Sequence, residues 1–96
     1  MKLRYTLPAL ADLASILDYV GARSPQGAAR IRTRIRSVTD LLLRYPLAGA
    51  MTDDPTIRRM TTTPYPYLIF YEKTDAEIII HAVRHGARDP ADNVRS

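Results

Sequence analysis

The chain has 96 residues, none of them cysteine and only four of them glycine. Without cysteine there is no disulfide framework, thiolate zinc site, iron–sulfur cluster or cysteine nucleophile. The scattered glycines form no phosphate-binding loop, so no nucleotide cofactor is expected. His81 and His85 are four residues apart on a predicted strand, roughly 13 Å, too far to ligate one ion together, so no metal is expected. The sequence also lacks an N-terminal apolar segment and any run approaching the ~20 apolar residues of a membrane span. These absences predict a cytoplasmic protein.

Arginine is the residue that the chain has in excess. Fourteen basic residues against ten acidic ones give a formal charge of +4, and twelve of the fourteen are arginine. Arginine is suited to bidentate contacts with phosphate or carboxylate. We therefore expect an acidic partner, which could be nucleic acid or an acidic protein segment, and net charge does not choose between them. The length predicts a single domain over 1–96.

The first half of the sequence has helical periodicity. After an alternating stretch at 2–6, apolar residues recur at spacings of three and four over 8–21 and again over 25–45. This pattern predicts a short strand followed by two amphipathic helices. Ser24-Pro25 supplies an N-cap and a first-turn proline for the second helix, and the short connection predicts an antiparallel hairpin. Residues 47–50 and 53–55 have the composition of a loop.

The second half of the sequence has the composition of a sheet. Residues 57–63, 67–72 and 77–84 are rich in β-branched, aromatic and aliphatic side chains and predict three strands. The short turn at 73–76 makes the last two an antiparallel hairpin. The predicted fold is α+β with the order β-α-α-β-β-β, a two-helix hairpin packed on a small, mainly antiparallel sheet. Residues 86–96 are predicted to form a flexible or partner-ordered tail.

Basic residues at the ends of the predicted strands form the first candidate site. Arg58 and Arg59 lie at the start of the second predicted strand, and Arg84 and Arg88 lie at the end of the last, with His85 beside Arg84. Adjacent strands could gather these four arginines into one cluster, and His85, at the strand end, is a separate candidate for a general acid or base. The other interpretation is a set of surface arginines paired with nearby aspartates.

The second predicted helix carries a separate band of arginines, at positions 30, 32, 34 and 36. Charged residues between core positions are what any amphipathic helix places in solvent. A phosphate-binding face is the alternative interpretation.

Several motifs occur in order along nearly the whole chain: Ala9-x-x-Asp12-Leu13-x-x-Ile16-x-x-Tyr19, Pro46-x-x-Gly49, Arg58-Arg59-Met60, Tyr65-Pro66-Tyr67-Leu68-Ile69-Phe70-Tyr71 and Val83-x-His85-Gly86-Ala87-Arg88-Asp89. Together they resemble the ParE-like (plasmid stabilisation) toxins of the RelE/ParE toxin superfamily. The resemblance implies the toxin of a type II toxin–antitoxin system, held inactive in a hetero-oligomer by a ParD-like antitoxin. It also implies the order of strands and helices predicted above.

Two activities known in the superfamily compete. ParE-like toxins are associated with inhibition of DNA gyrase, whereas RelE-like toxins cleave messenger RNA on the ribosome. The chain departs from the RelE-like pattern because Leu68 stands where a basic residue usually follows the strand tyrosine. In addition, Arg58-Arg59 replaces two spaced lysines, and residues 86–96 contain no tyrosine. The resemblance therefore favours a gyrase inhibitor that is not an enzyme.

Two alternatives stay open from the sequence. One is a ribosome-dependent endoribonuclease, whose phosphate clamp and proton carrier would be Arg59, Arg84, His85 and Arg88. The other is a member of the superfamily that binds its antitoxin without being toxic. In every case the groove along the helical hairpin is expected to hold the acidic, amphipathic antitoxin segment. The expected contacts are Leu10, Leu13, Leu17, Arg30 and Arg34.

Overall fold

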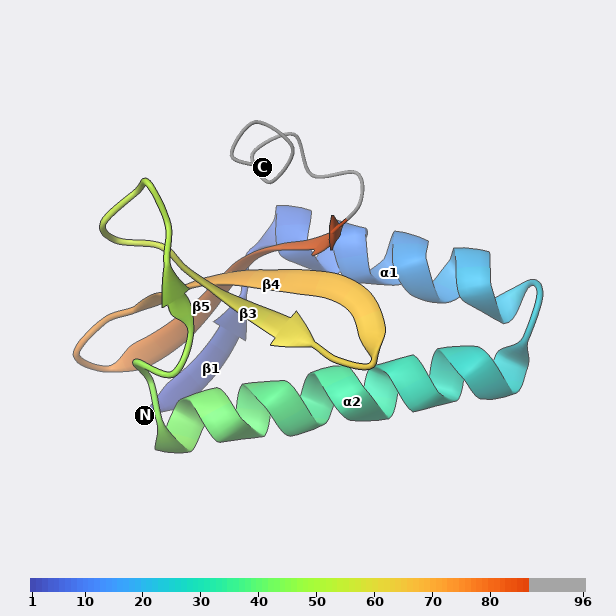
Figure 1. The fold of residues 1–96 in the computed structure, drawn as a ribbon, viewed down its shortest axis with the longest axis horizontal. Helices are drawn as coiled ribbons and strands as arrows, with labels where there is room; N and C mark the ends of the chain where they lie inside the picture. Colours follow the sequence, from blue (N-terminus) through green and yellow to red (C-terminus); the bar gives the residue numbers. More distant parts are fainter. Residues whose placement is uncertain (87–96) are drawn as a thin grey trace.

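Residues 1–86, the part of the chain that the computed structural model describes, form two layers (Figure 1). The helical layer consists of α1 (Leu7–Gly21) and α2 (Pro25–Arg44), joined as a hairpin. The strands of the sheet are β1 (Lys2–Tyr5), β2 (Ala50–Met51), β3 (Arg58–Thr62), β4 (Tyr65–Lys73) and β5 (Glu77–His85). The predicted α+β fold is thus confirmed. Neither of the helices described is long and apolar enough to cross a membrane.

Both helices begin at capping residues that the sequence supplies. Thr6 Oγ1 accepts a hydrogen bond of 3.2 Å from the Ala9 amide, and Ser24 Oγ accepts one of 2.9 Å from the Gly27 amide. Each cap is followed by a proline in the first turn of the helix, where no amide donor is needed. The observed helix boundaries lie within one residue of the predicted ones.

The strands are arranged in the order β1-β5-β4-β3-β2. β4 and β5 form the predicted antiparallel hairpin, and β1 pairs with β5 in parallel. The prediction of a loop over 47–50 is wrong at Ala50, which pairs with Arg59, and the next residue, Met51, pairs with Arg58 to complete the short edge strand β2. A strand of two residues is defined by its partner and carries no periodic pattern of its own.

Two predicted boundaries also differ at the ends of the long hairpin. β4 begins at Tyr65, two residues before the predicted start, and β5 continues through His85. Gly86, the first residue of the predicted tail, lies against Leu68, since a Cβ built on it would be 3.6 Å from Leu68 Cγ. The rest of that prediction, for residues 87–96, lies outside the part of the chain described.

Alternation along the strands gives the sheet an inner face against the helices and an outer face. Inward-facing residues of β4 and β5 are fully buried with apolar residues of α2 in one core, whose members include Ile35, Leu42, Ile69, Tyr71, Ile78, Ile80 and Val83. Residues between the inward positions, such as Leu68 and Phe70, face outward. The outer face is therefore the side of the sheet that the two helices leave uncovered.

The hydroxyl of Tyr71 fixes the Pro46-x-x-Gly49 segment that follows α2. It donates a hydrogen bond of 2.8 Å to the Pro46 carbonyl and accepts one of 2.9 Å from the Gly49 amide. Burial raises the pKa of Tyr71, more than the Gly49 hydrogen bond and the nearby Arg58 charge lower it, so the hydroxyl is a donor at neutral pH. Gly49 in turn carries the carbonyl that holds the Arg58 guanidinium at 2.8 Å.

Asp12 connects α1 to the sheet. β1 ends at Tyr5, opposite Ile80, so the last residues of β5 have no strand on that side. Asp12 Oδ2 accepts a hydrogen bond of 3.1 Å from the Val83 amide there. The carboxylate thereby satisfies a main-chain donor at an otherwise open sheet edge.

Candidate functional site

The sheet register places Arg59 and Arg84 on the outer face. Their neighbours Met60 and Val83 pack in the core, so the two arginines point the other way. Arg59 pairs with Phe70 and Arg84 pairs with Leu68, two residues apart on β4. Strand spacing and residue rise put their Cα atoms about 12 Å apart, within reach of a shared anion for two long side chains. This part of the predicted cluster is therefore close together.

His85 lies on the opposite face of the sheet. Its ring makes an edge-on contact with the buried Tyr67 ring, with centroids 5.6 Å apart. The two rings line a cavity of about 420 Å³ together with Ser15, Ile16 and Tyr19 of α1. The structure therefore separates His85 from Arg59 and Arg84, with which the ribonuclease alternative groups it. The fourth predicted member, Arg88, lies outside residues 1–86.

Arg58 connects two parts of the main chain. Its Nη1 donates hydrogen bonds to the carbonyls of Gly49 at 2.8 Å and Leu47 at 3.3 Å. The guanidinium therefore ties β3 to the loop that follows α2. Neighbouring positions on one strand alternate between faces, which separates Arg58 from Arg59.

Histidine and carboxylate side chains do not gather into a metal site in the part of the chain described. No three of them lie close enough together to hold an ion there. His81 and Glu72 form a pair on the β4–β5 hairpin, with Nε2 and Oε1 atoms 2.9 Å apart. An acid–base reaction at one substrate atom would need the basic and phosphate-binding groups on the same face.

The predicted antitoxin contacts fall on separate surfaces. Leu13 and Leu17 are half-buried and pack against the core, whereas Leu10 is 47% exposed. Leu10 belongs to an exposed apolar face of α1 that the sequence prediction did not identify. The α1 apolar face consists of Leu7, Leu10, Ala11 and Ala14. These residues recur at spacings of three and four, out of phase with the core positions of α1, and this pattern in the sequence could have identified the face.

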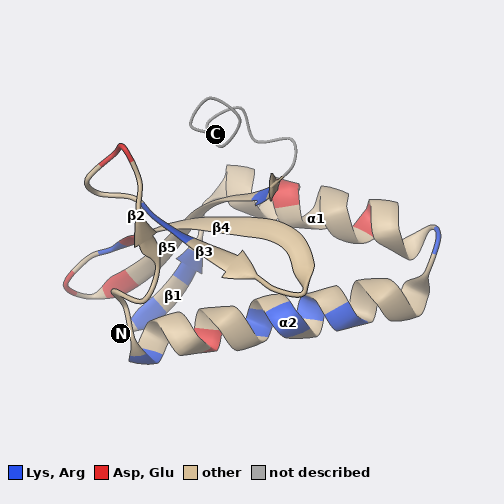
Figure 2. Cartoon of the chain, in the orientation of Figure 1, with Lys and Arg blue, Asp and Glu red and all other residues tan. Residues whose placement is uncertain are grey.

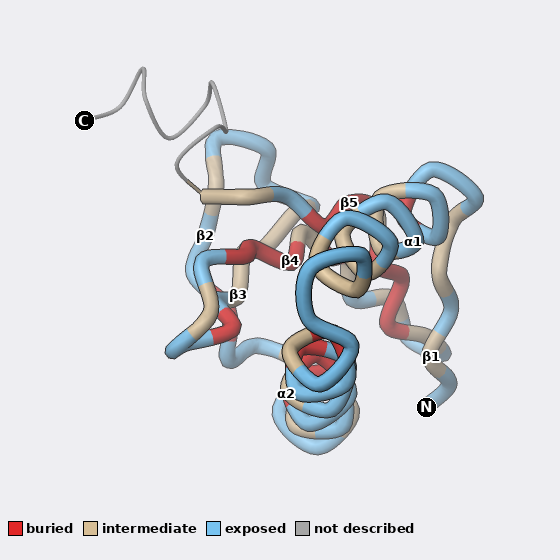
Figure 3. Tube along the Cα trace, turned by 90° about the vertical axis from the view of Figure 1, so that its right-hand side faces the viewer, coloured by how far each residue is buried: buried red, intermediate tan, exposed pale blue. Residues whose placement is uncertain are grey.

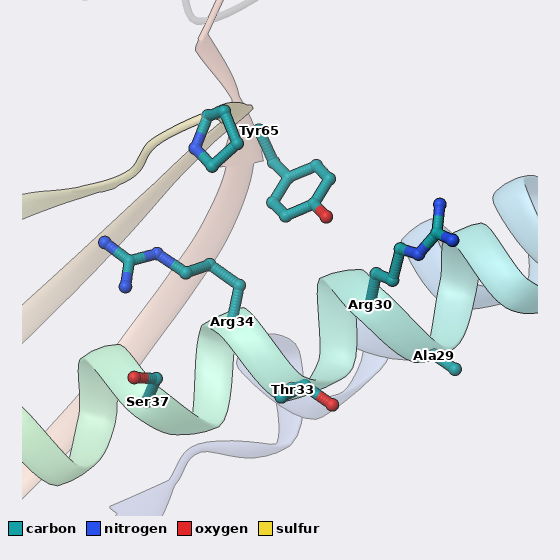
Figure 4. Close-up of a pocket in the computed structure, with 7 residues that line it drawn as sticks. Ala29, Arg30, Thr33, Arg34, Ser37 and Tyr65 are labelled. Carbon is teal, nitrogen blue, oxygen red and sulfur yellow. The ribbon is translucent and has the colours of Figure 1, made fainter.

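Arg30 and Arg34 lie on the flank of α2 that faces the β3–β4 turn. They line a groove of about 460 Å³ with Thr33, Pro64 and Tyr65 (Figure 4). Arg34 Nε donates a hydrogen bond of 2.8 Å to the Thr63 carbonyl. This groove is on the other side of α2 from Leu13, so the structure does not bring these arginines to the leucines of α1.

The opposite flank of α2 carries a second pair of arginines. Arg32 and Arg36 line a groove of about 270 Å³ with Leu3, Tyr5 and Leu13. This groove lies between α2, β1 and Leu13 of α1, so Arg32 and Arg36 are the arginines that line it with one of the predicted antitoxin contacts. A groove along the helical hairpin that holds the antitoxin stays a prediction.

Comparison with known proteins agrees with this fold. Residues 3–90 match the family model described as the ParE toxin of the type II toxin-antitoxin system parDE. The chain is 39% identical over 84 residues to "Toxin RelE2" of Caulobacter vibrioides, with 88% of this chain and 93% of that protein aligned. It is also similar to a structure titled "Chromosomal ParDE TA system from P. aeruginosa". That similarity has a TM-score of 0.76 and 25% identity, over 88% of this chain and 95% of the other.

The α+β fold with a helical hairpin on one face of its sheet is therefore that of a toxin of the RelE/ParE superfamily. The chain belongs to the ParE family of toxins of type II toxin–antitoxin systems.

Proposed function

We propose that this toxin acts by binding DNA gyrase and does not cleave messenger RNA. The observation that carries the proposal is the separation of the basic residues by the sheet: Arg59 and Arg84 lie on the outer face and His85 on the inner one. Ribonucleolytic cleavage needs a cation at the phosphate and a proton carrier at the 2′-hydroxyl or leaving oxygen of the same nucleotide. His85 is not positioned to share a phosphate with the two arginines.

The outer face has the chemistry of a protein-binding surface. Phe70, which is half-buried, and Leu68, which is only 9% exposed, lie between Arg59 and Arg84 in the strand register. Aromatic residues and arginine are enriched at the centres of protein interfaces, where lysine and carboxylates are depleted. We propose that this face contacts the toxin's target.

The competing function is ribosome-dependent messenger RNA cleavage, suggested by the name of the relative from Caulobacter vibrioides, "Toxin RelE2". Expressing the chain in bacteria, with a DNA-damage reporter and a translation reporter in the same cells, separates the two. A gyrase inhibitor induces the damage reporter first, whereas a ribonuclease stops translation first. Loss of translation before induction of the damage reporter would refute the gyrase proposal.

Variants sharpen this comparison. Arg59→Ala with Arg84→Ala should reduce toxicity without unfolding the chain, because both side chains extend from the outer face. His85→Gln should keep most of the toxicity under the gyrase proposal and abolish it under the ribonuclease one. Two results together would contradict the assignment of the target face. They are loss of toxicity in folded His85→Gln and messenger cleavage by the toxin that persists in the double arginine variant.

We further propose that a ParD-like antitoxin neutralises the toxin by packing an amphipathic helix on the α1 apolar face. Leu7 is 81% exposed and Leu10 is 47% exposed, and two alanines beside them allow close approach. The structure from P. aeruginosa is titled a ParDE TA system, which supports an antitoxin as the partner. Leu13 and Leu17 contribute to the core under this face, and Arg30 and Arg34 are not part of it.

Leu10→Glu tests this binding face. A carboxylate in the centre of an apolar helix interface should weaken antitoxin binding by at least about tenfold, or roughly 1.4 kcal/mol. Leu47→Glu is the matched control, because Leu47 is also exposed, at 61%, but lies in the loop after α2. Equal antitoxin affinity for both variants, measured by calorimetry, would place the antitoxin elsewhere.

A further inference from the structure

Helix α2 carries a band of basic residues (Figure 2). With five arginines and one aspartate it has a formal charge of +4, equal to that of the complete sequence, so the charges outside it cancel. Within residues 1–86, no carboxylate forms an ion pair with the arginines at positions 30, 32, 34 and 36. These guanidinium groups are therefore available to an external anion.

The arginines form two rows on opposite flanks of α2. With about 100° per residue, Arg30 and Arg34 lie on one side of the core-facing stripe, and Arg32 and Arg36 lie on the other. Each row borders one of the two grooves described above, next to the β3–β4 turn and next to β1. The outward side of α2 is exposed (Figure 3). Between the two rows it carries a ridge of small, exposed residues, Ala29, Thr33 and Ser37, which also border the groove of Arg30 and Arg34.

We propose that α2 binds double-stranded DNA, with this ridge in the major groove and one row of arginines on each sugar-phosphate backbone. The major groove is about 12 Å wide and admits a helix of roughly that diameter. Small side chains on the ridge allow the helix axis to approach the bases, and the flanking guanidinium groups form bidentate contacts with phosphates.

The placement of the two rows favours DNA over an acidic peptide as the anion. A peptide strand lying in one groove meets Arg30 and Arg34 or Arg32 and Arg36, but not both pairs, because the helix body separates them. The two backbones of a duplex lie on either side of a helix in the major groove and meet both pairs.

Two further details limit the proposed footprint. Arg34 Nε is bound to the Thr63 carbonyl at 2.8 Å, which orients its guanidinium while leaving both terminal NH₂ groups for a phosphate. Asp40, the one carboxylate of α2, lies beyond the last of these arginines and is exposed. Its charge repels phosphate, so the contact is confined to the part of α2 before it.

Fluorescence anisotropy with the full-length toxin and a 16-base-pair duplex of arbitrary sequence tests the proposal. Four phosphate contacts predict that raising salt from about 50 to 200 mM weakens binding roughly 150-fold, because each contact contributes a slope of ~0.9. Removing one row, in Arg30→Gln/Arg34→Gln or in Arg32→Gln/Arg36→Gln, should reduce this salt effect to about 12-fold in either case.

The matched control is Lys2→Gln/Lys73→Gln, which removes the same charge from two exposed residues outside α2. It should keep the full salt dependence. Thermal melting shows whether loss of the Arg34 bond to Thr63 disturbs the fold of the double variant. If it does, Arg30→Gln alone takes the place of that variant. An equal effect of the control, an effect of only one row, or no duplex binding overturns the proposal. Loss of antitoxin affinity in the arginine variants, with duplex binding unchanged, would assign α2 to an acidic protein segment.

Discussion

Replacing Gly49 by alanine should destabilise the toxin although the new side chain is a single methyl group. A Cβ at this position would lie 2.6 Å from Tyr71 Cε1, 2.7 Å from the Tyr71 hydroxyl and 3.0 Å from the Arg59 carbonyl. Tyr71 is fully buried and Arg59 O belongs to the main chain of β3, so neither can yield easily. No glycine among the described residues has a positive φ, which makes the penalty steric and not conformational.

The size of the effect follows from two losses. Overpacking a filled core costs about 1–3 kcal/mol. Displacing Tyr71 also breaks its hydrogen bonds to Gly49 and Pro46, and a buried polar group left without a partner costs about 1–3 kcal/mol. Partial relaxation makes a total of about 2–4 kcal/mol reasonable. For a chain of this size that lowers the melting temperature by roughly 10–30 °C.

Gly21→Ala is the matched control for this measurement. The added methyl would lie 3.6 Å from Ala28 Cβ, an ordinary contact, at the end of α1. Because alanine is the better helix former, this variant should be stabilised by about 0.5 kcal/mol. Urea unfolding of both variants by circular dichroism tests the account. Equal stability of Gly49→Ala and the unmodified chain would show that Tyr71 does not fix the loop as described.

Further predictions concern the sheet edge and the buried tyrosines. Asp12→Asn should lower the free energy of unfolding by about 1 kcal/mol, because a neutral amide oxygen replaces the charged acceptor of the Val83 amide. Hydrogen exchange at the Val83 amide should accelerate. Asp18→Asn, on the exposed side of α1, is the control and should change neither quantity. Burial raises the pKa of Tyr5 and Tyr71 above 10.0, so their contribution to stability is complete below pH 10 and is lost as the pH rises further. Urea unfolding between pH 8 and 11 should show this decline, and Tyr71→Phe should reduce it; a flat profile would contradict the burial of these hydroxyls.

The helices and the β4–β5 hairpin were predictable because their signals are local. Capping residues, first-turn prolines and the spacing of apolar positions all lie within the segments they define. The parallel pairing of β1 with β5 was not predicted, since it joins residues more than seventy positions apart. β2 escaped prediction because its two residues become a strand only through Arg58 and Arg59.

The candidate site was predictable in composition but not in geometry. Arg84 and His85 are neighbours on one strand, so alternation alone indicates that they face opposite ways once the strand is recognised. Whether Arg59 joins Arg84 depends on the register between three strands. That register shifts at irregularities between Thr61 and Thr62 and between Phe70 and Tyr71, which no sequence pattern marked.

The exposed apolar face of α1 was missed because two sets of apolar residues share this helix. Leu7 and Leu10 repeat with helical spacing, but the core stripe of the same helix includes Leu13 and Leu17. The sequence spacing separates the two sets of positions by phase, but packing against the sheet decides which set is buried and which is exposed. This is why the predicted antitoxin contacts combined residues from two surfaces.

The most direct test of the proposed target is a reaction of the purified toxin with gyrase and plasmid DNA, run beside a translation reaction with labelled messenger RNA. The proposal predicts loss of supercoiling activity or gyrase-dependent DNA breaks, with the messenger intact. Messenger cut on the ribosome, with gyrase unaffected and the cleavage abolished by His85→Gln, would contradict it and establish the ribonuclease alternative.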